Sequence, residues 1–346
     1  MTKKPAGLIL LPRRQIINAN AISGPLTWGF PPPTAFTGFM HALQRHLGAQ
    51  RLPTEDLGLG KDASLDGIGI ICHQFWPQID KSGYRYHFSL SKNPVESKKK
   101  IESDGRLKGA SFVEEGRARL EVSLIIGVHL GGDGDSYLDK EDGKILARRV
   151  GDLASSMRLA GGSFIPMPES KKHRPVYKEL SGDTEKDSKV FRSIRRRLLP
   201  GFALIHRHDL LIDHLIEMRE TNPETNILDA LLDLCSLKSE PSASSTDSSE
   251  DVVWQRSRVK PGWLVPLPVG YGAISRVYPA GTVKNARDNE SPMRFVESIY
   301  SLGEWISPHR IDQANDLLWY HKASPDEGLY ICDHQTSFHT TINQGD

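Results

Sequence analysis

Segments with strand and helix patterns alternate through the first half of the chain, and their order limits the folds open to it. Two segments, 34–48 and 144–157, repeat apolar residues at helical spacing. Four segments have the length and apolar content of strands: residues 7–17, 68–75, 121–128 and 163–166. The order is therefore strand, helix, strand, strand, helix, strand. That order predicts an α+β protein with a ferredoxin-like, RNA-recognition-like head.

The side chains of the two helices predict which face of each is buried. We expect the first helix to begin at Thr34, its N-cap, and to end at Gly48. Its apolar face consists of Phe36, Phe39, Met40, Leu43 and Leu47. The apolar stripe of the second helix consists of Ile145, Val150, Leu153, Ala154 and Met157. Gly161 and Gly162 then stop this helix or turn the chain sharply.

Composition divides the chain further, within a single expected domain of 346 residues. Residues 77–111 are polar and contain three consecutive lysines, which predicts a mobile, thumb-like lobe inserted into a head made of 7–76 and 112–205. Three further parts follow. Residues 206–238 are expected to be helical, residues 239–251 form a serine-rich acidic linker, and residues 252–346 are expected to pack on the head. Within the last part, helices are expected near 292–300 and 310–321.

The segment 17–33 contains amides, small residues, a tryptophan and prolines, which predicts an irregular loop feeding a helix N-terminus. Such a loop gathers polar groups, an aromatic plane and free backbone N–H groups, as RNA binding requires. We interpret Trp28 as a base-stacking residue and Asn18, Asn20 and Ser23 as contacts to base edges. The alternative is a structural loop whose asparagines satisfy backbone groups and whose tryptophan is in the core.

A glycine pair and a strand arginine are further candidate RNA contacts. Gly161, Gly162 and Ser163 would let the backbone approach a phosphate that Arg158 clamps, but the same residues also suit a helix end. Arg117 lies on a predicted strand, where pairing with a neighbouring glutamate is an equally good interpretation. Each motif therefore has a structural alternative.

Other basic side chains and one histidine complete the candidates. Residues 171–199 are basic and contain no long apolar run. The arginine run in this segment, Arg195, Arg196 and Arg197, is either a phosphate-binding ridge or a solvated face. His41 is a surface or RNA-stacking residue in our interpretation, and the alternative is a general acid for RNA cleavage. Arg45, one helical turn later, is a further candidate RNA contact.

Composition excludes several other classes of protein. The net charge of +1 is too small for a protein that binds nucleic acid by charge alone, so RNA contacts would be local or shared with partners. Three cysteines without a CxxC pair argue against a disulfide framework or a zinc ribbon. We find no nucleotide-binding or catalytic motif, and expect no cofactor and no metal. No apolar run could span a bilayer, so we expect a cytoplasmic protein without membrane contact.

The motifs resemble one family. Met157-Arg-Leu-Ala-Gly-Gly-Ser163 and Lys260-Pro-Gly-Trp-Leu-Val-Pro-Leu-Pro268 are similar to segments of the type I-F CRISPR–Cas (Csy) subunit that caps the 5′ handle of the guide RNA, the crRNA. Other segments share the resemblance in the same order: residues 18–30, 41–45, 113–118, 197–203, 228–235, 285–288, 303–310 and 318–321.

The resemblance implies a fold of the repeat-associated (RAMP) superfamily, with an RNA-recognition-like head and a thumb. It implies a heterodimer with the large, PAM-reading subunit, contact with the backbone subunit, and access to target DNA only through the assembled complex. It also implies no catalytic role, because separate nucleases of the system trim the guide and cut the target. Two alternatives remain: a metal-independent ribonuclease that processes the guide through His41, and a scaffold that never touches RNA.

Overall fold

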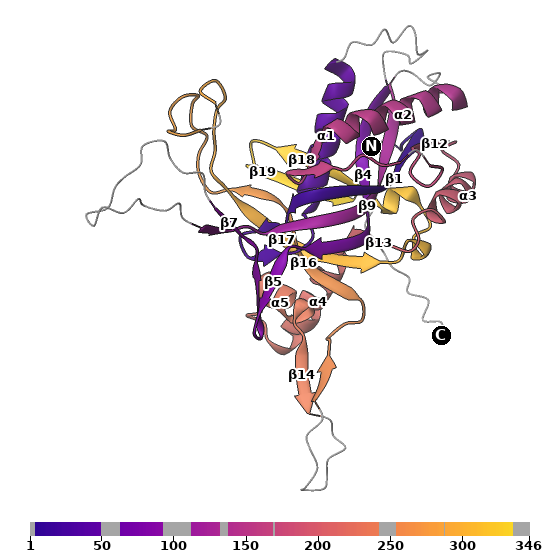
Figure 1. The fold of residues 1–346 in the computed structure, drawn as a ribbon. Coiled ribbons are helices and arrows are strands. Elements are labelled where there is room, and N and C mark those ends of the chain that lie inside the picture. The colour runs from indigo at the N-terminus through magenta and orange to yellow at the C-terminus, as the bar shows by residue number, and fades with distance from the viewer. Residues whose placement is uncertain are drawn as a thin grey trace.

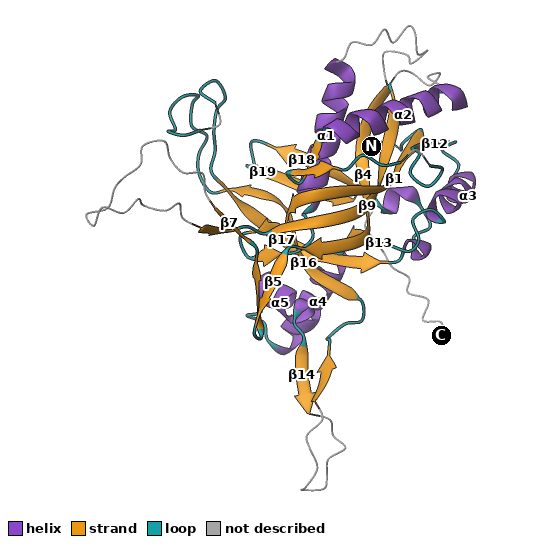
Figure 2. Ribbon diagram, in the orientation of Figure 1, coloured by secondary structure: helices purple, strands orange, loops and turns teal. Residues whose placement is uncertain are grey.

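The computed structural model describes residues 4–49, 63–92, 112–131, 138–168, 170–241, 254–286 and 288–334. Five helices lie within them: α1 (Pro33–Ala49), α2 (Lys140–Ser156), α3 (Thr184–Arg195), α4 (His208–Thr221) and α5 (Ile227–Cys235). The strands are β1 (Gly7–Asn20), β2 (Ile22–Gly24), β3 (Thr27–Trp28), β4 (Ala63–Pro77), β5 (Ile79–Ser82), β6 (Arg85–Phe88), β7 (Leu90–Lys92), β8 (Phe112–Glu114), β9 (Arg117–Leu130), β10 (Arg158–Leu159), β11 (Gly162–Phe164), β12 (Val176–Glu179), β13 (Phe202–His206), β14 (Lys238–Pro241), β15 (Trp254–Ser257), β16 (Trp263–Ala273), β17 (Val296–Ile306), β18 (Leu318–Ser324) and β19 (Leu329–His334). Most strands join one large antiparallel sheet of eleven strands, so the protein is mixed α/β (Figures 1 and 2).

The N-terminal part of the sheet has the strand order β11–β1–β9–β4. The long antiparallel pairing of β1 with β9 sets Ile9 opposite Ile126. Alternate residues of a strand point to opposite faces. Ile9 accordingly packs with the apolar side chains of α1 and α2, while Leu8 packs with Phe191 of α3. Two helices therefore cover one face of this part of the sheet, and α3 covers the other.

Strand β4 closes the rest of the sheet into a ring. One edge of β4 pairs with β9, where Gly69 lies opposite Ile125. Its other edge is shared, because Gly69 also pairs with Leu318 of β18, and Cys72 pairs with Phe202 of β13. The pairing continues from β13 through β17, β16 and β19 to β18. Six strands thus form a closed ring, to which β9 is attached from outside.

Helices α4 and α5 form a layer of their own. Their buried leucines, Leu211, Leu215, Leu231 and Leu234, form a separate apolar cluster with Leu264 of β16 and Leu302 of β17. In Figure 1 these helices lie at the lower side of the sheet, away from α1 and α2, and the β14–β15 hairpin projects beyond them. Of the helices in the described ranges, none is long and apolar enough to cross a membrane.

The prediction of an irregular loop over 17–33 is wrong. Strand β1 continues to Asn20, and β2 and β3 form a hairpin directly after it. Two β-bulges bend β1 along its pairing with β9, and Asn18 takes a φ of 56°. Asparagine tolerates this left-handed conformation better than most residues, so a polar, unusual sequence still pairs as a strand.

The first predicted helix is confirmed, but its N-cap is wrong. Helix α1 begins at Pro33, a residue favoured in the first turn because its missing N–H is not needed there. Thr34 is therefore already helical, and the helix extends one residue past Gly48. The predicted apolar face is correct, since its first four side chains are buried and Leu47 packs against the same core.

The second helix is also confirmed, with a different start and one wrong core residue. Asp139 is the N-cap of α2, because its carboxylate accepts the backbone N–H groups of Glu141 and Asp142. Ile145 is 41% exposed, so its place in the predicted apolar stripe is wrong. The buried face instead includes Leu146, one residue later.

The predicted C-terminal helices at 292–300 and 310–321 are wrong. These residues contribute to β17 and β18, with two short 3-10 turns between them (Pro308–Arg310 and Ala314–Asp316). Strand β17 is hydrogen-bonded along both edges, to β13 and β16, and such tertiary pairing overrides a weak local helical pattern. The basic segment 171–199, for which nothing was predicted, contains β12 and α3.

Only part of the predicted thumb-like lobe is described. Residues 77–92 include the β5–β6 hairpin and β7, which pairs with β8 after the lobe. Its other residues, 93–111, lie outside the described ranges. Of the predicted linker over 239–251, the first three residues belong to β14, which pairs with β15, and the rest also lie outside.

Candidate nucleic-acid interface

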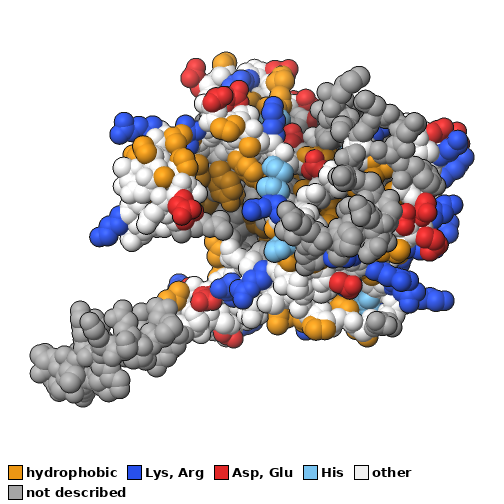
Figure 3. Space-filling view, turned by 90° about the horizontal axis from the view of Figure 1, so that it is seen from above, with side chains coloured by type: hydrophobic (Ala, Val, Ile, Leu, Met, Phe, Trp, Pro, Cys, Tyr) orange, Lys and Arg blue, Asp and Glu red, His pale blue; other side chains and the backbone are white. Residues whose placement is uncertain are grey.

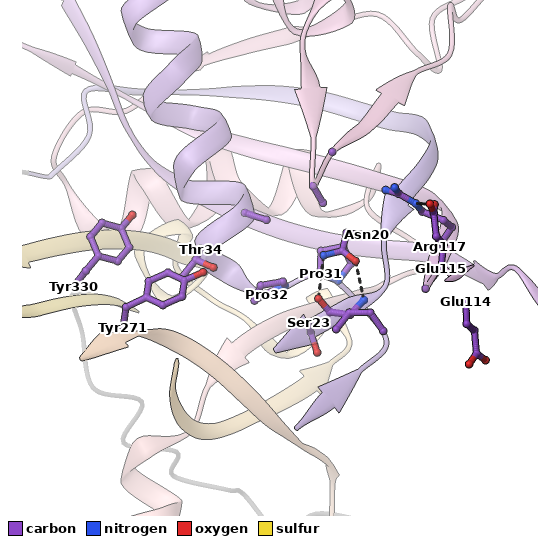
Figure 4. Close-up of a pocket in the computed structure, with 15 residues that line it drawn as sticks. Asn20, Ser23, Pro31, Pro32, Thr34, Glu114, Glu115, Arg117, Tyr271 and Tyr330 are labelled. Atoms are coloured by element: carbon purple, nitrogen blue, oxygen red, sulfur yellow. Dashed lines mark hydrogen bonds and ion pairs between the residues drawn. The ribbon is translucent and has the colours of Figure 1, made fainter. Parts of the chain in front are cut away.

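A cavity of about 900 Å³ opens where the end of β1 meets the start of α1. Four predicted RNA-binding residues from three separate motifs line it: Asn20, Ser23, Arg117 and Gly161. Figure 4 shows the cavity between two tyrosines of the C-terminal strands and the glutamates that precede β9, with Pro31 and Pro32, just before α1, in the middle. A helix N-terminus favours negative or electron-rich ligand groups.

The polar side chains on the β1 side are partly engaged. Asn20 accepts the N–H of Ile22 at 3.0 Å and donates to the carbonyl of Ile22 at 3.0 Å. Ser23 donates its hydroxyl to Thr27 at 2.8 Å. Asn20 thus satisfies nearby backbone, as the structural alternative expects. A carboxamide has two donor hydrogens and two acceptor lone pairs, however, so one of each stays free for a ligand.

Arg117 forms an ion pair with Glu115 at 3.0 Å, and Glu114 accepts the N–H of Phe88 at 2.7 Å. Hydrogen bonds from Ser91 and Arg117 lower the pKa of Glu115, so this carboxylate stays charged. Because carboxylates stand beside a single arginine, this wall has little net positive charge. It therefore suits a base or a sugar better than a phosphate.

The glycine pair lies in a hairpin rather than at the end of a helix, with Gly161 in the turn and Gly162 as the first residue of β11. Ala160 and Gly161 have φ values of 50° and 75° between β10 and β11. A Cβ at Gly162 would lie 2.7 Å from the backbone N of Ala19, so this glycine is required by packing against β1. Two other predicted residues, Arg158 and Ser163, face each other across the hairpin and are exposed.

Four aromatic rings form a row that starts at the cavity. Ring centroids of Tyr271 and Tyr330 are 6.3 Å apart, those of Tyr330 and His321 are 5.7 Å apart, and those of His321 and His41 are 5.5 Å apart. Both tyrosines line the cavity, and His41 shares the exposed face of α1 with Arg45, one turn away. Sequence reasoning found only His41, because the other rings come from β16, β18 and β19 and share no local pattern. Figure 3 views the molecule from above and shows histidine side chains near the middle of that view.

Trp28 and Asn18 lie outside this cavity. Trp28 is 58% exposed and packs edge-on against Phe88, so the alternative that places it in the core is wrong. It lines a second, apolar groove of about 670 Å³ with Phe202 and Trp263. Asn18 is exposed and accepts a hydrogen bond from the side chain of Gln78 at 2.9 Å.

The arginine run is also remote from the cavity, and its members differ. Arg195 donates to the carbonyls of His309 and Ile311 at 3.0 and 2.9 Å, and Arg197 donates to that of Lys171 at 2.7 Å. These two arginines therefore tie segments of the fold together. Arg196 is exposed and has no hydrogen bond from its side chain to any described residue.

One set of three side chains in the interior resembles a catalytic triad. His206 lies between Asp333 and Ser301, with contacts of 2.6 and 2.8 Å, the order found in serine hydrolases. Ser301 is only 4% exposed, so a substrate could not reach its hydroxyl. Within the ranges that the structure describes, no group of three or more His, Cys, Asp or Glu side chains is arranged to hold a metal ion.

Comparison with known proteins gives the class and then the family. The chain matches the model of the family described as CRISPR-associated protein (Cas_Csy2) over residues 9–332. It is 51% identical over 333 residues to the CRISPR-associated protein Csy2 of Pseudomonas aeruginosa (strain UCBPP-PA14), and the alignment covers 94% of each chain. The chain is thus a CRISPR-associated protein. More particularly, the chain belongs to the Csy2 family, and is a subunit of a type I-F Csy complex, which confirms the resemblance seen in its motifs.

Proposed function

We propose that this chain binds the 5′ handle of the guide RNA, without cleaving it, in the type I-F Csy complex. The observation that carries the proposal is the row of rings from Tyr271 to His41, which begins at a cavity lined by amide and hydroxyl groups. Tyr271 and His41, at the two ends of the row, are exposed and provide stacking surfaces for bases, and the cavity provides hydrogen bonds to one base edge or ribose.

The sheet topology supports the RAMP assignment within this proposal. The order β11–β1–β9–β4, with α1 and α2 packed in one cluster on the same face, is the order expected of a ferredoxin-like head. The β5–β6 and β7–β8 hairpins leave this head where the thumb was expected.

The proposal includes protein partners. The chain would form a heterodimer with the large, PAM-reading subunit, contact the backbone subunit, and meet target DNA only through the complex, in the cytoplasm and without a cofactor. Its net charge of +1 supports shared binding of the RNA. Exposed apolar side chains on α5, among them Leu228 and Leu232, supply a surface for a protein partner.

Substitution of one ring tests the RNA site. Tyr271 is 39% exposed, so Tyr271→Ala should leave the fold intact. Loss of one stacked base should weaken binding of the guide RNA by about 1–3 kcal/mol. Trp254→Ala removes another exposed ring, on β15, and serves as the matched control. Equal affinities of the two variants in filter binding would refute the RNA site.

One observation favours the alternative of a ribonuclease that processes the guide. His41, the candidate general acid, stacks on His321, and His321 stacks on Tyr330 beside the cavity. Incubation of the purified chain with end-labelled repeat RNA in EDTA distinguishes the two functions. We expect intact RNA. Cleavage that disappears in His41→Ala would establish the alternative instead.

A further inference from the structure

A third cavity, of about 580 Å³, lies between α2, the middle of β1 and the residues 166–168 and 170–175. Its wall contains three arginines and one carboxylate: Arg14, Arg148, Arg174 and Asp152. We propose that this cavity binds a phosphate group, either a free phosphate ion or a phosphodiester of a nucleic acid. None of its lining residues lines the cavity beside the tyrosines, so the proposal does not depend on the handle site.

Arg14 is the main support for this inference. The residue is only 8% exposed, and its buried Nε has no hydrogen-bond partner in the described part of the chain. A guanidinium carries five N–H donors, and a buried charge is normally paired and hydrogen-bonded. The neighbouring Arg13, by contrast, pairs with Glu121 at 2.7 Å. Arg14 therefore lacks the counter-charge that its burial requires.

The other charged groups around the cavity do not provide that counter-charge. Burial lowers the pKa of Arg14, and Asp152 opposes this only at a distance, without an ion pair between the two described side chains. Burial, together with nearby Lys172 and Arg14, also lowers the pKa of His173, so this ring is neutral near pH 7. Arg148 and Arg174 add two exposed positive charges at the same cavity. The net charge facing the cavity is therefore positive.

The shape of the cavity also suits an anion. Residue 151 of α2 is a glycine, and a Cβ there would stand 3.3 Å from an Nη of Arg14 and 2.5 Å from Pro175. The glycine thus leaves the guanidinium room to reach the cavity. Planar guanidinium groups bind the oxygens of phosphate in pairs, which a lysine ammonium does not. The volume also allows a ligand of nucleotide size.

Variants at the cavity mouth test the site without disturbing the core. Arg14→Gln alters a buried side chain and risks misfolding, so Arg148→Gln and Arg174→Gln are the variants of choice. Arg310→Gln removes one exposed charge elsewhere and is the matched control. The full-length proteins are melted in sodium phosphate and in sodium chloride of equal ionic strength. We expect phosphate to raise the melting temperature of the wild type and of the control, and to do so less in both cavity variants.

A second measurement distinguishes the two sources of phosphate. A single-stranded RNA oligonucleotide without terminal phosphates is titrated into the same proteins. If the site holds a phosphodiester, affinity should fall about tenfold in each cavity variant relative to Arg310→Gln, since hydrogen bonds to charged groups are lost. If it holds a free ion, RNA affinity should match the control while the phosphate effect is still lost. Cavity variants that respond to both phosphate and RNA as the control does would overturn the proposal.

Discussion

Trp319 donates its indole N–H to the carbonyl oxygen of Leu204 at 2.9 Å, within the interior of the molecule. The bond connects β18 to β13, the two strands that share the outer edge of β4. Trp319 is fully buried, and both residues belong to the core that also contains the apolar faces of α1 and α2. The C-terminal strands and the N-terminal head therefore share one core.

Acid should weaken this core. Burial lowers the pKa of His334, whose ring lies 4.3 Å from that of Trp319, to about 4. Unfolded histidine titrates near pH 6.5, so between these two values the unfolded chain binds more protons, and the free energy of unfolding falls as pH falls. The loss should reach about 2 kcal/mol at pH 5 relative to pH 7. Urea unfolding at both pH values measures it. His334→Asn should show a clearly smaller loss, and an equal loss in the variant would contradict the assignment.

Substitutions in the arginine run should separate structural from RNA-binding members. Arg195→Ala removes two hydrogen bonds to backbone carbonyls and should destabilise the protein by about 1–3 kcal/mol. Arg196→Ala should change stability by less than about 0.5 kcal/mol, because its side chain is exposed. If Arg196 contacts an RNA phosphate, the slope of log K against log salt should decrease by about 0.7. An unchanged slope would assign Arg196 to a solvated face.

Trp28→Ala should weaken binding of the guide RNA more than it lowers the stability of the fold. Because the indole is 58% exposed, its removal should cost about 1 kcal/mol or less of stability, chiefly the edge-on contact with Phe88. If the ring stacks on a base, guide capture should weaken by about 1–3 kcal/mol. Both quantities are measured on the same variant. A protein with unchanged guide affinity would rule out stacking and leave the apolar groove beside Trp28 to another ligand.

The predicted heterodimer can be tested at α5. Leu231 and Leu234 are buried, whereas Leu228 and Leu232 are 54% and 59% exposed on the opposite face. The double variant Leu228→Ser/Leu232→Ser should keep its melting temperature but weaken co-purification with the large subunit, by about 1–2 kcal/mol per side chain in the interface.

Ile274→Ser, 67% exposed on another surface, is the control for this experiment. If both proteins retain the large subunit equally in gel filtration, α5 is not the interface.

The helices α1 and α2 could be predicted because the spacing of apolar residues within each segment indicates a helix with one buried face. The apolar face of α1 could be found because its spacing is helical within a few residues. Strand β17 could not, since its conformation depends on β13 and β16 on either side of it. The cavity shows the same limit. Asn20, Arg117 and Gly161 were each singled out, but only the pairing of β1 with β9 and the packing of the β10–β11 hairpin bring them together.

The shared edge of β4 also constrains how the chain can be made. On the ribosome, the inner edge of β4 can pair with β9 early, but its outer edge gains its partners late. Ile71 and Cys72 pair there only when β13 has emerged, and Ile68 and Gly69 only when β18 has. Until then a long apolar strand displays unpaired N–H and C=O groups, the kind of edge that recruits other chains. A nascent chain would pass through this exposed state during most of its synthesis, and a transcript that ended before β18 would encode a protein unable to leave it.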